Sequence, residues 1–207
     1  MQKPKLVIFD CDEILLDHLG ALGEFVKKNY NITPKTTHPI EYGLVDWLGV
    51  SQCEVQEILR VFNEESYEFG LLKALDPYAP GLIKAIQYGI PGVKFAVLTK
   101  SGTHGHGEVL RRVNIEHVYP EQFDEVHIIE MNESKSEVLS NLKDRYDVIC
   151  LVDDYIQNIE DAIDLGIPGV MLSRPHNQEY KDRTDFRYVD TWGGIICAVI
   201  DIHAGGE

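Results

Sequence analysis

The chain has 207 residues, of which 44% are hydrophobic, a proportion that excludes a largely disordered protein. This length suits one sizeable domain, or a core with a small accessory domain. The net charge of −15 excludes extended binding to nucleic acid, because such binding relies on clustered Lys and Arg that displace counterions.

The N-terminal segment, MQKPKLVIFD, leads into an apolar run at residues 5–10 that ends in an acid. Such a run predicts a strand buried on both faces of a sheet. A secretory signal would need a longer apolar stretch and a small-residue cleavage site. No run approaches the ~18–20 apolar residues that cross a bilayer. We therefore expect a cytoplasmic protein with no membrane partner.

Residues 17–75 predict a small helical domain inserted after the first strand, while 1–16 and 76–207 predict the core. The insertion contains two or three helical patterns and no convincing strand. Ser51 and Glu54 match a capping box ahead of one apolar helical face. Two aromatic residues of the insertion, Trp47 and Phe62, would either stack on a substrate base or pack the interior of this domain.

Apolar runs alternate with helical patterns in the rest of the chain. Four runs resemble the first, at 94–99, 125–130, 147–152 and 169–173. The segments between them place apolar residues at helical spacing in four groups: Leu82, Ile83 and Ile86; Val109, Leu110 and Val113; Val138, Leu139 and Leu142; Ile159, Ala162 and Ile163. Helix boundaries are predicted at Pro80, Gly89, Gly166 and a capping box of Ser134 with Glu137. The alternation predicts an α/β fold with a Rossmann-like parallel sheet and helices on both faces.

Polar side chains follow the predicted strands at their carboxyl ends, where open parallel sheets carry their sites. They are Asp10 and Asp12 after the first strand, Thr99, Lys100 and Ser101 at the second, Lys135 beyond the third, and Asp153 with Asp154 at the fourth. Taken singly, each has a structural explanation, such as a turn, a cap or a solvated helix residue. Their order on four strand ends favours a shared site.

These residue types suit phosphoryl transfer. A carboxylate such as Asp10 can attack phosphorus when a cation neutralises the phosphate. Mg²⁺ prefers oxygen ligands, which Asp10 and Asp153 would supply. Asp12 would protonate the leaving oxygen and then activate water. Thr99 and Lys135 would hold phosphate oxygens, and the lysine would reduce repulsion among the acids.

The same residues resemble the four motifs of the haloacid dehalogenase-like hydrolase superfamily over nearly the whole chain. The similar segments are VIFDCDEILLD (7–17), FAVLTKSG (95–102), NESKSEVL (132–139) and VDDYIQNIEDAIDLGIPGVML (152–172). The resemblance implies a magnesium-dependent phosphomonoester hydrolase with an aspartyl-phosphate intermediate on Asp10 and a helical cap. It implies that Asp12 is the general acid/base and that its main-chain carbonyl binds Mg²⁺. Asp153 would ligate the metal directly, and Asp154 directly or through water.

Within the superfamily the chain is most similar to the 5′(3′)-deoxyribonucleotidases and their bacterial and phage relatives. The similarity lies in the length and in the segments DWLGVSQCEVQEI (46–58) and MLSRPHNQEY (171–180). It implies a nucleoside monophosphate as the substrate and partner. The alternative is a phosphatase for another small metabolite, such as a sugar or glycolate phosphate.

Two residues depart from the pattern of the superfamily. Glu13 stands where the first motif usually has Gly, and Lys100 after Thr99 is unusual. Lys100 would compensate Glu13, bind the substrate together with Ser101, or lie exposed.

Other kinds of protein and of site are less well supported. A phospho-acceptor receiver domain has its phosphorylated Asp after the acid pair and no helical insertion. A catalytically silent binding protein would normally have lost one of the motif residues, and none is missing. A dehalogenase would have no task for Asp12, and the net charge disfavours a polynucleotide 3′-phosphatase. His104 and His106 lack a third ligand in the sequence, which favours an exposed loop over a metal site.

Overall fold

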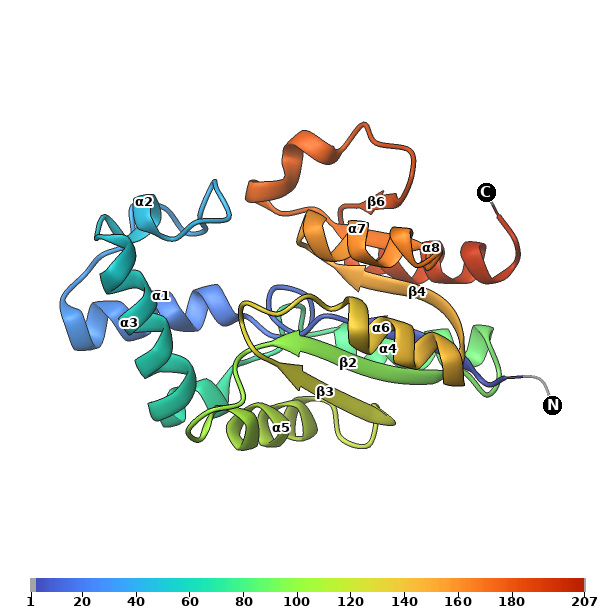
Figure 1. The fold of residues 1–207 in the computed structure, drawn as a ribbon, viewed down its shortest axis with the longest axis horizontal. Coiled ribbons are helices and arrows are strands. Elements are labelled where there is room, and N and C mark those ends of the chain that lie inside the picture. The colour runs from blue at the N-terminus through green and yellow to red at the C-terminus, as the bar shows by residue number, and fades with distance from the viewer. Residues whose placement is uncertain (1–2, 207) are drawn as a thin grey trace.

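The computed structural model describes residues 3–206 as a six-stranded, wholly parallel sheet in the order β3-β2-β1-β4-β5-β6 (Figure 1). The strands are β1 (Lys5–Phe9), β2 (Lys94–Lys100), β3 (Glu125–Ile129), β4 (Asp147–Asp153), β5 (Gly169–Leu172) and β6 (Arg187–Val189). The five predicted strands end within one residue of the observed ends. The predicted parallel sheet is confirmed, while β6 was not predicted.

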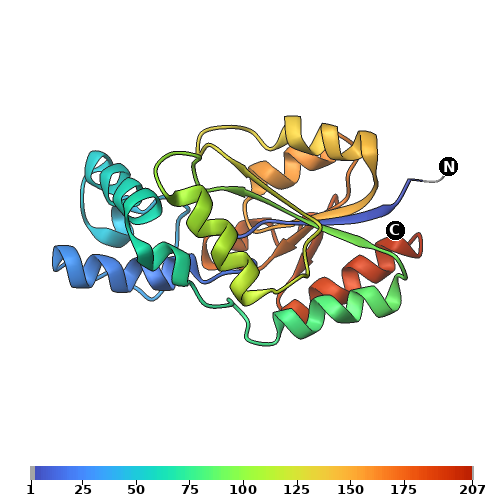
Figure 2. The same cartoon turned by 90° about the horizontal axis from the view of Figure 1, so that it is seen from below.

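Helices cover both faces of the sheet because alternate residues of its strands are apolar on both sides. Leu6 and Ile8 of β1 pack against α6 (Ser136–Arg145) and α7 (Ile156–Asp164). Val7 and Phe9 lie in the other apolar layer, which includes residues of α4 (Ala79–Gly89), α5 (Gly107–Val118) and α8 (Trp192–His203). Figure 2 shows these two helical layers above and below the sheet. No helix among residues 3–206 is long and apolar enough to span a membrane.

Helix α5 buries a different face from the one predicted. Val109 and Val113 are 63% and 57% exposed, whereas Arg111 and Asn114 are fully buried. Asn114 donates through Nδ2 to the carbonyl of Leu72 at 2.9 Å and accepts from its N–H at 3.1 Å. The prediction was wrong because the polar side chains of α5 bind backbone and acidic partners that are distant in the sequence.

Most of the predicted helix boundaries are confirmed. The capping box of Ser51 and Glu54 forms at the start of α3 (Gln52–Arg60), and α4 carries Pro80 in its first turn and ends at Gly89. The prediction of a capping box formed by Ser134 and Glu137 is wrong. Lys135 occupies the N-cap of α6 with its side chain directed into the site described below, and Ser134 instead binds the N–H of Ser136.

The helical insertion lies beyond the carboxyl ends of the strands (Figure 1). It comprises α1 (His18–Tyr30), α2 (Val45–Leu48), α3, a π-helical turn η1 (Val61–Glu65) and a 3₁₀ turn η2 (Tyr67–Leu71). The chain enters and leaves it side by side, because the N–H of Leu75 donates to the carbonyl of Leu15 at 2.9 Å. The division of the chain at residues 17 and 75 stays a prediction.

Candidate active site

Lys135 links the first strand to the fourth at the carboxyl edge of the sheet. Its Nζ donates to Oδ1 of Asp10 at 2.5 Å and to Oδ2 of Asp153 at 2.6 Å, and its side chain is fully buried. Asp10 directly follows β1, and Asp153 is the last residue of β4, which pairs with β1. Adjacent parallel strands therefore bring together residues that are more than a hundred positions apart.

Three buried carboxylates share this small space. Asp10, Asp153 and Asp154 each have an oxygen within 4.8 Å of the other two. The amide of Asn158 donates to both oxygens of Asp153, at 3.1 and 3.0 Å, and the N–H of Tyr155 donates to the same group at 2.9 Å. These contacts fix Asp153, while Asp10 and Asp154 line the cavity described below.

Burial dominates the ionisation of this cluster. It raises the pKa of Asp10 well above its ordinary value; Lys135 opposes the shift, whereas Asp153 and Asp154 add to it. Burial also lowers the pKa of Lys135, but Asp10 and Asp153 outweigh burial and leave this pKa raised. One lysine thus faces three acids, which favours the binding of a further cation.

Several buried polar atoms have no hydrogen-bond partner within residues 3–206. Among them are Oγ1 of Thr99, Oγ of Ser101, Oδ1 of Asn158 and Oε2 of Glu13. Such atoms are rare in folded proteins unless they serve a ligand. Thr99 and Asn158 line the cavity, so their free atoms can bind a ligand. Ser101 is buried but is not among the lining residues, so its predicted contact with substrate stays a prediction.

Asp12 is held by an arginine that sequence reasoning missed. Nη2 of Arg111 lies 2.6 Å from Oδ1 of Asp12, although the two groups are not aligned as a hydrogen bond. The guanidinium also donates to Sγ of Cys11 at 3.3 Å and lies 4.2 Å from the centre of the Phe69 ring. Burial lowers the pKa of Arg111, but Asp12 outweighs it, so Arg111 stays charged. Arg111 therefore links the expected acid/base to η2.

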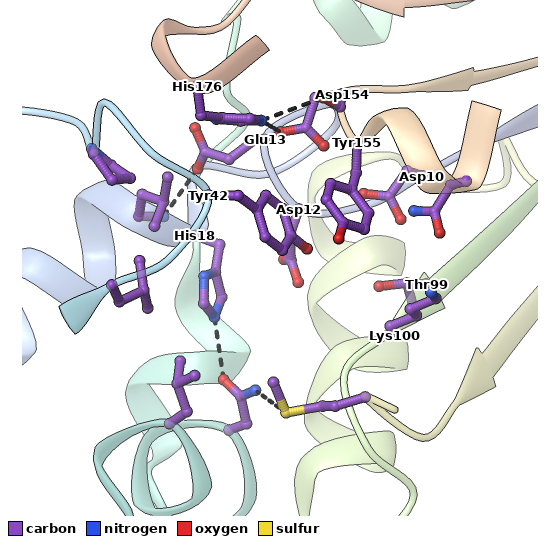
Figure 3. Close-up of a pocket in the computed structure, with 17 residues that line it drawn as sticks. Asp10, Asp12, Glu13, His18, Tyr42, Thr99, Lys100, Asp154, Tyr155 and His176 are labelled. Carbon is purple, nitrogen blue, oxygen red and sulfur yellow. Dashed lines mark hydrogen bonds and ion pairs between the residues drawn. The ribbon is translucent and has the colours of Figure 1, made fainter. Parts of the chain in front are cut away.

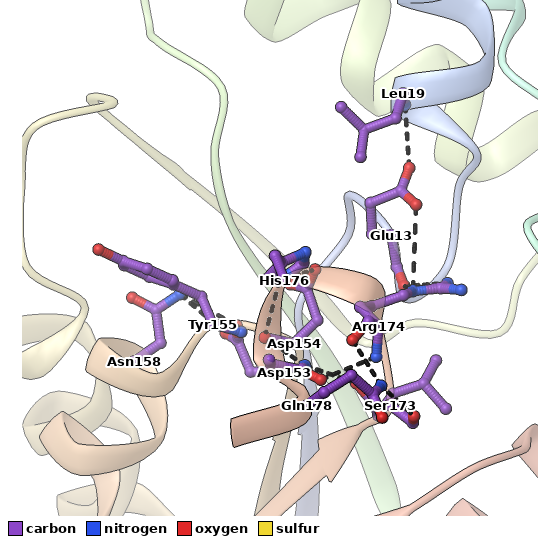
Figure 4. A network of polar contacts seen from close by, with 12 residues as sticks. Glu13, Leu19, Asp153, Asp154, Tyr155, Asn158, Ser173, Arg174, His176 and Gln178 are labelled. Atoms are coloured by element: carbon purple, nitrogen blue, oxygen red, sulfur yellow. Dashed lines mark hydrogen bonds and ion pairs between the residues drawn. The ribbon is translucent and has the colours of Figure 1, made fainter. Parts of the chain in front are cut away.

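Glu13 adopts the left-handed conformation that favours glycine, with φ of 58°. Its Oε1 accepts from the N–H of Leu19 at 2.9 Å, and its carbonyl accepts from Arg174 at 3.1 and 2.5 Å (Figure 4). Burial raises the pKa of Glu13 to about 7, while Leu19 and Arg174 oppose the shift. Arg174, rather than Lys100, is thus the cation closest to Glu13.

The candidate site opens into a cavity of about 190 Å³ between the sheet edge and the insertion (Figure 3). From the core it is lined by Asp10, Asp12, Glu13, Thr99, Lys100, Met131, Asp154, Tyr155, Asn158 and His176, and from the insertion by His18, Leu19, Pro39, Tyr42, Leu44, Leu59 and Asn63. Lys100 lines this cavity and is partly buried, so it does not simply lie exposed. Trp47 and Phe62 are 4% and 0% exposed and pack in the apolar core.

Aromatic rings that line the cavity join the insertion to the core. Tyr42 of the insertion stacks on Tyr155 with ring centres 3.8 Å apart, and its ring meets the edge of His176 at 5.5 Å. Nε2 of His176 lies 3.3 Å from Oδ2 of Asp154. Asp154 is therefore oriented by a residue of the 3₁₀ helix η3 (Pro175–Tyr180), which follows β5. His104, by contrast, is 76% exposed and near Glu130, and no group of three metal-binding side chains among residues 3–206 includes it.

Comparisons with known proteins agree with this fold. No family model matches the chain. A bacteriophage T4 protein described as an uncharacterised 32.4 kDa protein of the gp30–rIII intergenic region is 27% identical over 201 aligned residues, which cover 91% of this chain and 67% of that protein.

Several solved structures share the architecture. A protein of Lactobacillus delbrueckii subsp. bulgaricus, provisionally assigned as a phosphoglycolate phosphatase, has a TM-score of 0.65 and 18% identity over 96% of this chain and 99% of that one. A haloacid dehalogenase-superfamily hydrolase of subfamily IA from Geobacter sulfurreducens has a TM-score of 0.61 and 15% identity over 95% and 96%. CbbY of Rhodobacter sphaeroides, solved with phosphate, has a TM-score of 0.58 and 17% identity over 91% and 95%. At these identities the likeness shows the fold alone, which is the haloacid dehalogenase-like fold.

Proposed function

We propose that this chain, which has the haloacid dehalogenase-like fold, is a magnesium-dependent phosphomonoester hydrolase with Asp10 as its nucleophile. One observation carries the proposal. Buried Lys135 bridges Asp10 and Asp153 beside a third acid, Asp154, and the unpartnered hydroxyl of Thr99, and Asp10, Asp154 and Thr99 line one cavity.

The acid cluster fits Mg²⁺. Asp10, Asp153 and Asp154 offer hard oxygen ligands within 4.8 Å of one another, and Lys135 offsets only part of their charge. The main-chain carbonyl of Asp12 is a further expected ligand. When bound, the ion would neutralise charge on the phosphate and so allow an anionic nucleophile to approach it.

The chain's own residues then account for the two steps of hydrolysis. A carboxylate oxygen of Asp10 attacks phosphorus, and the bond from phosphorus to the leaving oxygen breaks as Asp12 gives that oxygen a proton. In the second step Asp12 takes a proton from water, which attacks the phosphorus of the aspartyl-phosphate and regenerates Asp10. Thr99 and Lys135 hold the phosphate oxygens during both steps.

A small phosphorylated metabolite of the sugar or glycolate phosphate type is the better supported substrate. The cavity of about 190 Å³ is smaller than the roughly 300–1,000 Å³ of pockets that enclose drug-sized ligands. Trp47 and Phe62 are buried, so they offer no platform for a nucleoside base. A nucleoside monophosphate is the second candidate, since the stacked rings of Tyr42 and Tyr155 line the cavity.

Phosphate release from p-nitrophenyl phosphate and a panel of sugar, glycolate and nucleotide monophosphates tests the function. We expect turnover with Mg²⁺, none in EDTA, and higher kcat/KM for the sugar monophosphates than for nucleotides. Mg²⁺ should also raise the Tm, because an ion that binds only the folded chain stabilises it. Turnover unaffected by EDTA, or none from folded protein, would contradict the proposal.

Replacing Arg111 with Met is expected to lower kcat about 10- to 100-fold and change KM less. Arg111 holds Asp12, and a positioned general acid contributes roughly 10²–10⁴ in rate. The matched control is Arg112→Met, because Arg112 is the next residue of α5 but is 46% exposed and paired with Glu108. Steady-state kinetics of both variants, with Arg111→Lys as a partial rescue, check this role. Equal kinetics for the two Met variants would show that Arg111 does not position Asp12.

A further inference from the structure

The cavity has two sides of different chemistry (Figure 3). Asp10, Thr99 and Lys100 lie on one side, and His18 and Glu13 lie on the opposite side. Burial lowers the pKa of Lys100 and the charge of Lys135 lowers it further, so the two lysines share one neighbourhood. The side with Asp10 is where the phosphate must sit, and the opposite side is left for the leaving group.

The insertion supplies much of the cavity lining. Its apolar residues there are Leu19, Pro39, Leu44 and Leu59, and the core adds Met131. Two of its polar residues form a pair that has spare hydrogen-bonding capacity. Nε2 of His18 contacts Oδ1 of Asn63 at 3.1 Å, while the acceptor that Nδ2 of Asn63 meets among residues 3–206 is the weak one, Sδ of Met131, at 3.8 Å.

Glu13 contributes a hydrogen-bond acceptor, Oε2, to the leaving-group side of the cavity. Its Oε2 is buried and has no hydrogen-bond partner within residues 3–206. The nearest guanidinium, of Arg174, is 4.0 Å away from this oxygen and donates to the carbonyl of Glu13 instead. A hydroxyl group near Oε2 of Glu13 could donate to it, and a hydroxyl group near Nδ2 of Asn63 could accept from that amide.

The charged residues that line the cavity also favour an uncharged leaving group. Among the described residues that line it, Lys100 is the one lysine or arginine, against the four acids Asp10, Asp12, Glu13 and Asp154. The imidazole of His176 is engaged with Asp154. An anionic leaving group on the side opposite Asp10 would therefore lose its hydration without gaining a lysine or arginine partner from the cavity lining.

We propose that the cavity takes monophosphates whose leaving group is small, uncharged and hydroxylated, as in a polyol or sugar phosphate. It rejects esters whose leaving group carries a carboxylate or a second phosphate. This inference rests on the phosphatase activity proposed above. It distinguishes sugar phosphates from phosphoglycolate as substrates, a distinction that the similarity to the named structures does not make.

A matched pair of substrates tests it. Glycerol 3-phosphate and 3-phosphoglycerate have the same carbon skeleton and differ only in a CH₂OH against a carboxylate. With Mg²⁺ present, we expect kcat/KM to be roughly 100-fold higher for glycerol 3-phosphate, the penalty for an unpaired charge. 2-Hydroxyethyl phosphate against phosphoglycolate repeats the comparison on a shorter skeleton. Equal or faster turnover of the carboxylates overturns the inference.

A cation placed on the leaving-group side should reverse this preference. Leu59 of α3 lines the cavity and is partly exposed, so Leu59→Arg adds a guanidinium there, and Leu59→Gln is the neutral control. We expect the ratio of kcat/KM to shift roughly tenfold toward 3-phosphoglycerate in the Arg variant alone. An unchanged ratio in the Arg variant overturns the inference.

Turnover of p-nitrophenyl phosphate separates the two proposals. If the folded chain hydrolyses this ester with Mg²⁺ but prefers carboxylate substrates, the leaving-group inference fails and the phosphatase stands. If it hydrolyses no phosphoester, both fail.

Discussion

Replacing Asp10 with Asn is expected to lower the rate of magnesium-dependent phosphate release roughly 10⁴-fold or more, without destabilising the fold. An amide cannot act as the nucleophile, and the loss of a nucleophile removes most of the rate enhancement. The fold should tolerate the change because burial and the neighbouring acids raise the pKa of Asp10. The charged carboxylate therefore destabilises the native state, and its removal should not lower the free energy of unfolding. Lys135 keeps Asp153 as its partner.

Activity and stability are measured on the same preparations for this variant, by phosphate release and by urea unfolding. Asp182→Asn is the matched control, because Asp182 is an exposed acid outside the cavity. A folded Asp10→Asn protein that kept more than about a hundredth of the activity would assign the nucleophile to another residue. A large drop in its unfolding free energy would contradict the electrostatic argument.

Replacing Lys135 with Met is expected to lower the free energy of unfolding by about 3–5 kcal/mol and to abolish activity. Removing one partner of a buried ion pair leaves the other charge uncompensated, and here two carboxylates lose the same partner. Urea unfolding at neutral pH measures the loss, with Lys84→Met as an exposed control. Mg²⁺ should restore part of the stability, since it supplies the missing positive charge.

A double variant separates electrostatics from lost packing. Lys135→Met combined with Asp10→Asn removes the cation and one of its acids together, so it should recover roughly 1–2 kcal/mol relative to Lys135→Met alone. If the two single effects simply add, the methylene groups of the lysine, rather than its charge, stabilise the site.

Much of the fold and of the candidate site was predictable for one physical reason. The core strands are apolar on both faces and the helices between them are amphipathic, so both leave a clear periodicity. Parallel strands end at a common edge, and their order in the chain therefore indicated that Asp10, Thr99 and Asp153 would meet. Strand β6 has three residues and α8 is apolar on nearly all sides, so neither leaves such a pattern.

Contacts between distant segments were not predictable from local patterns. Arg111 and Asn114 look like solvent-facing residues of α5, and their burial depends on Asp12 and Leu72, which no spacing reveals. Tyr42 and Tyr155 stack only because the insertion lies over the sheet edge. Glu13 was noticed as a departure from glycine, but its contacts with Leu19 and Arg174 needed the three-dimensional structure.

The pairing of the two linkers makes the insertion an exchangeable unit. Leu16 and Ala74 form an antiparallel bridge, so the chain leaves the core and rejoins it at one point. A segment of another length could be grafted between these residues, because each doubling of a closed loop costs only about 0.6 kcal/mol of entropy. Selection can therefore change the wall that meets the leaving group while the acids and lysine on the sheet stay in place. Chemistry and substrate choice can evolve at different rates in this architecture.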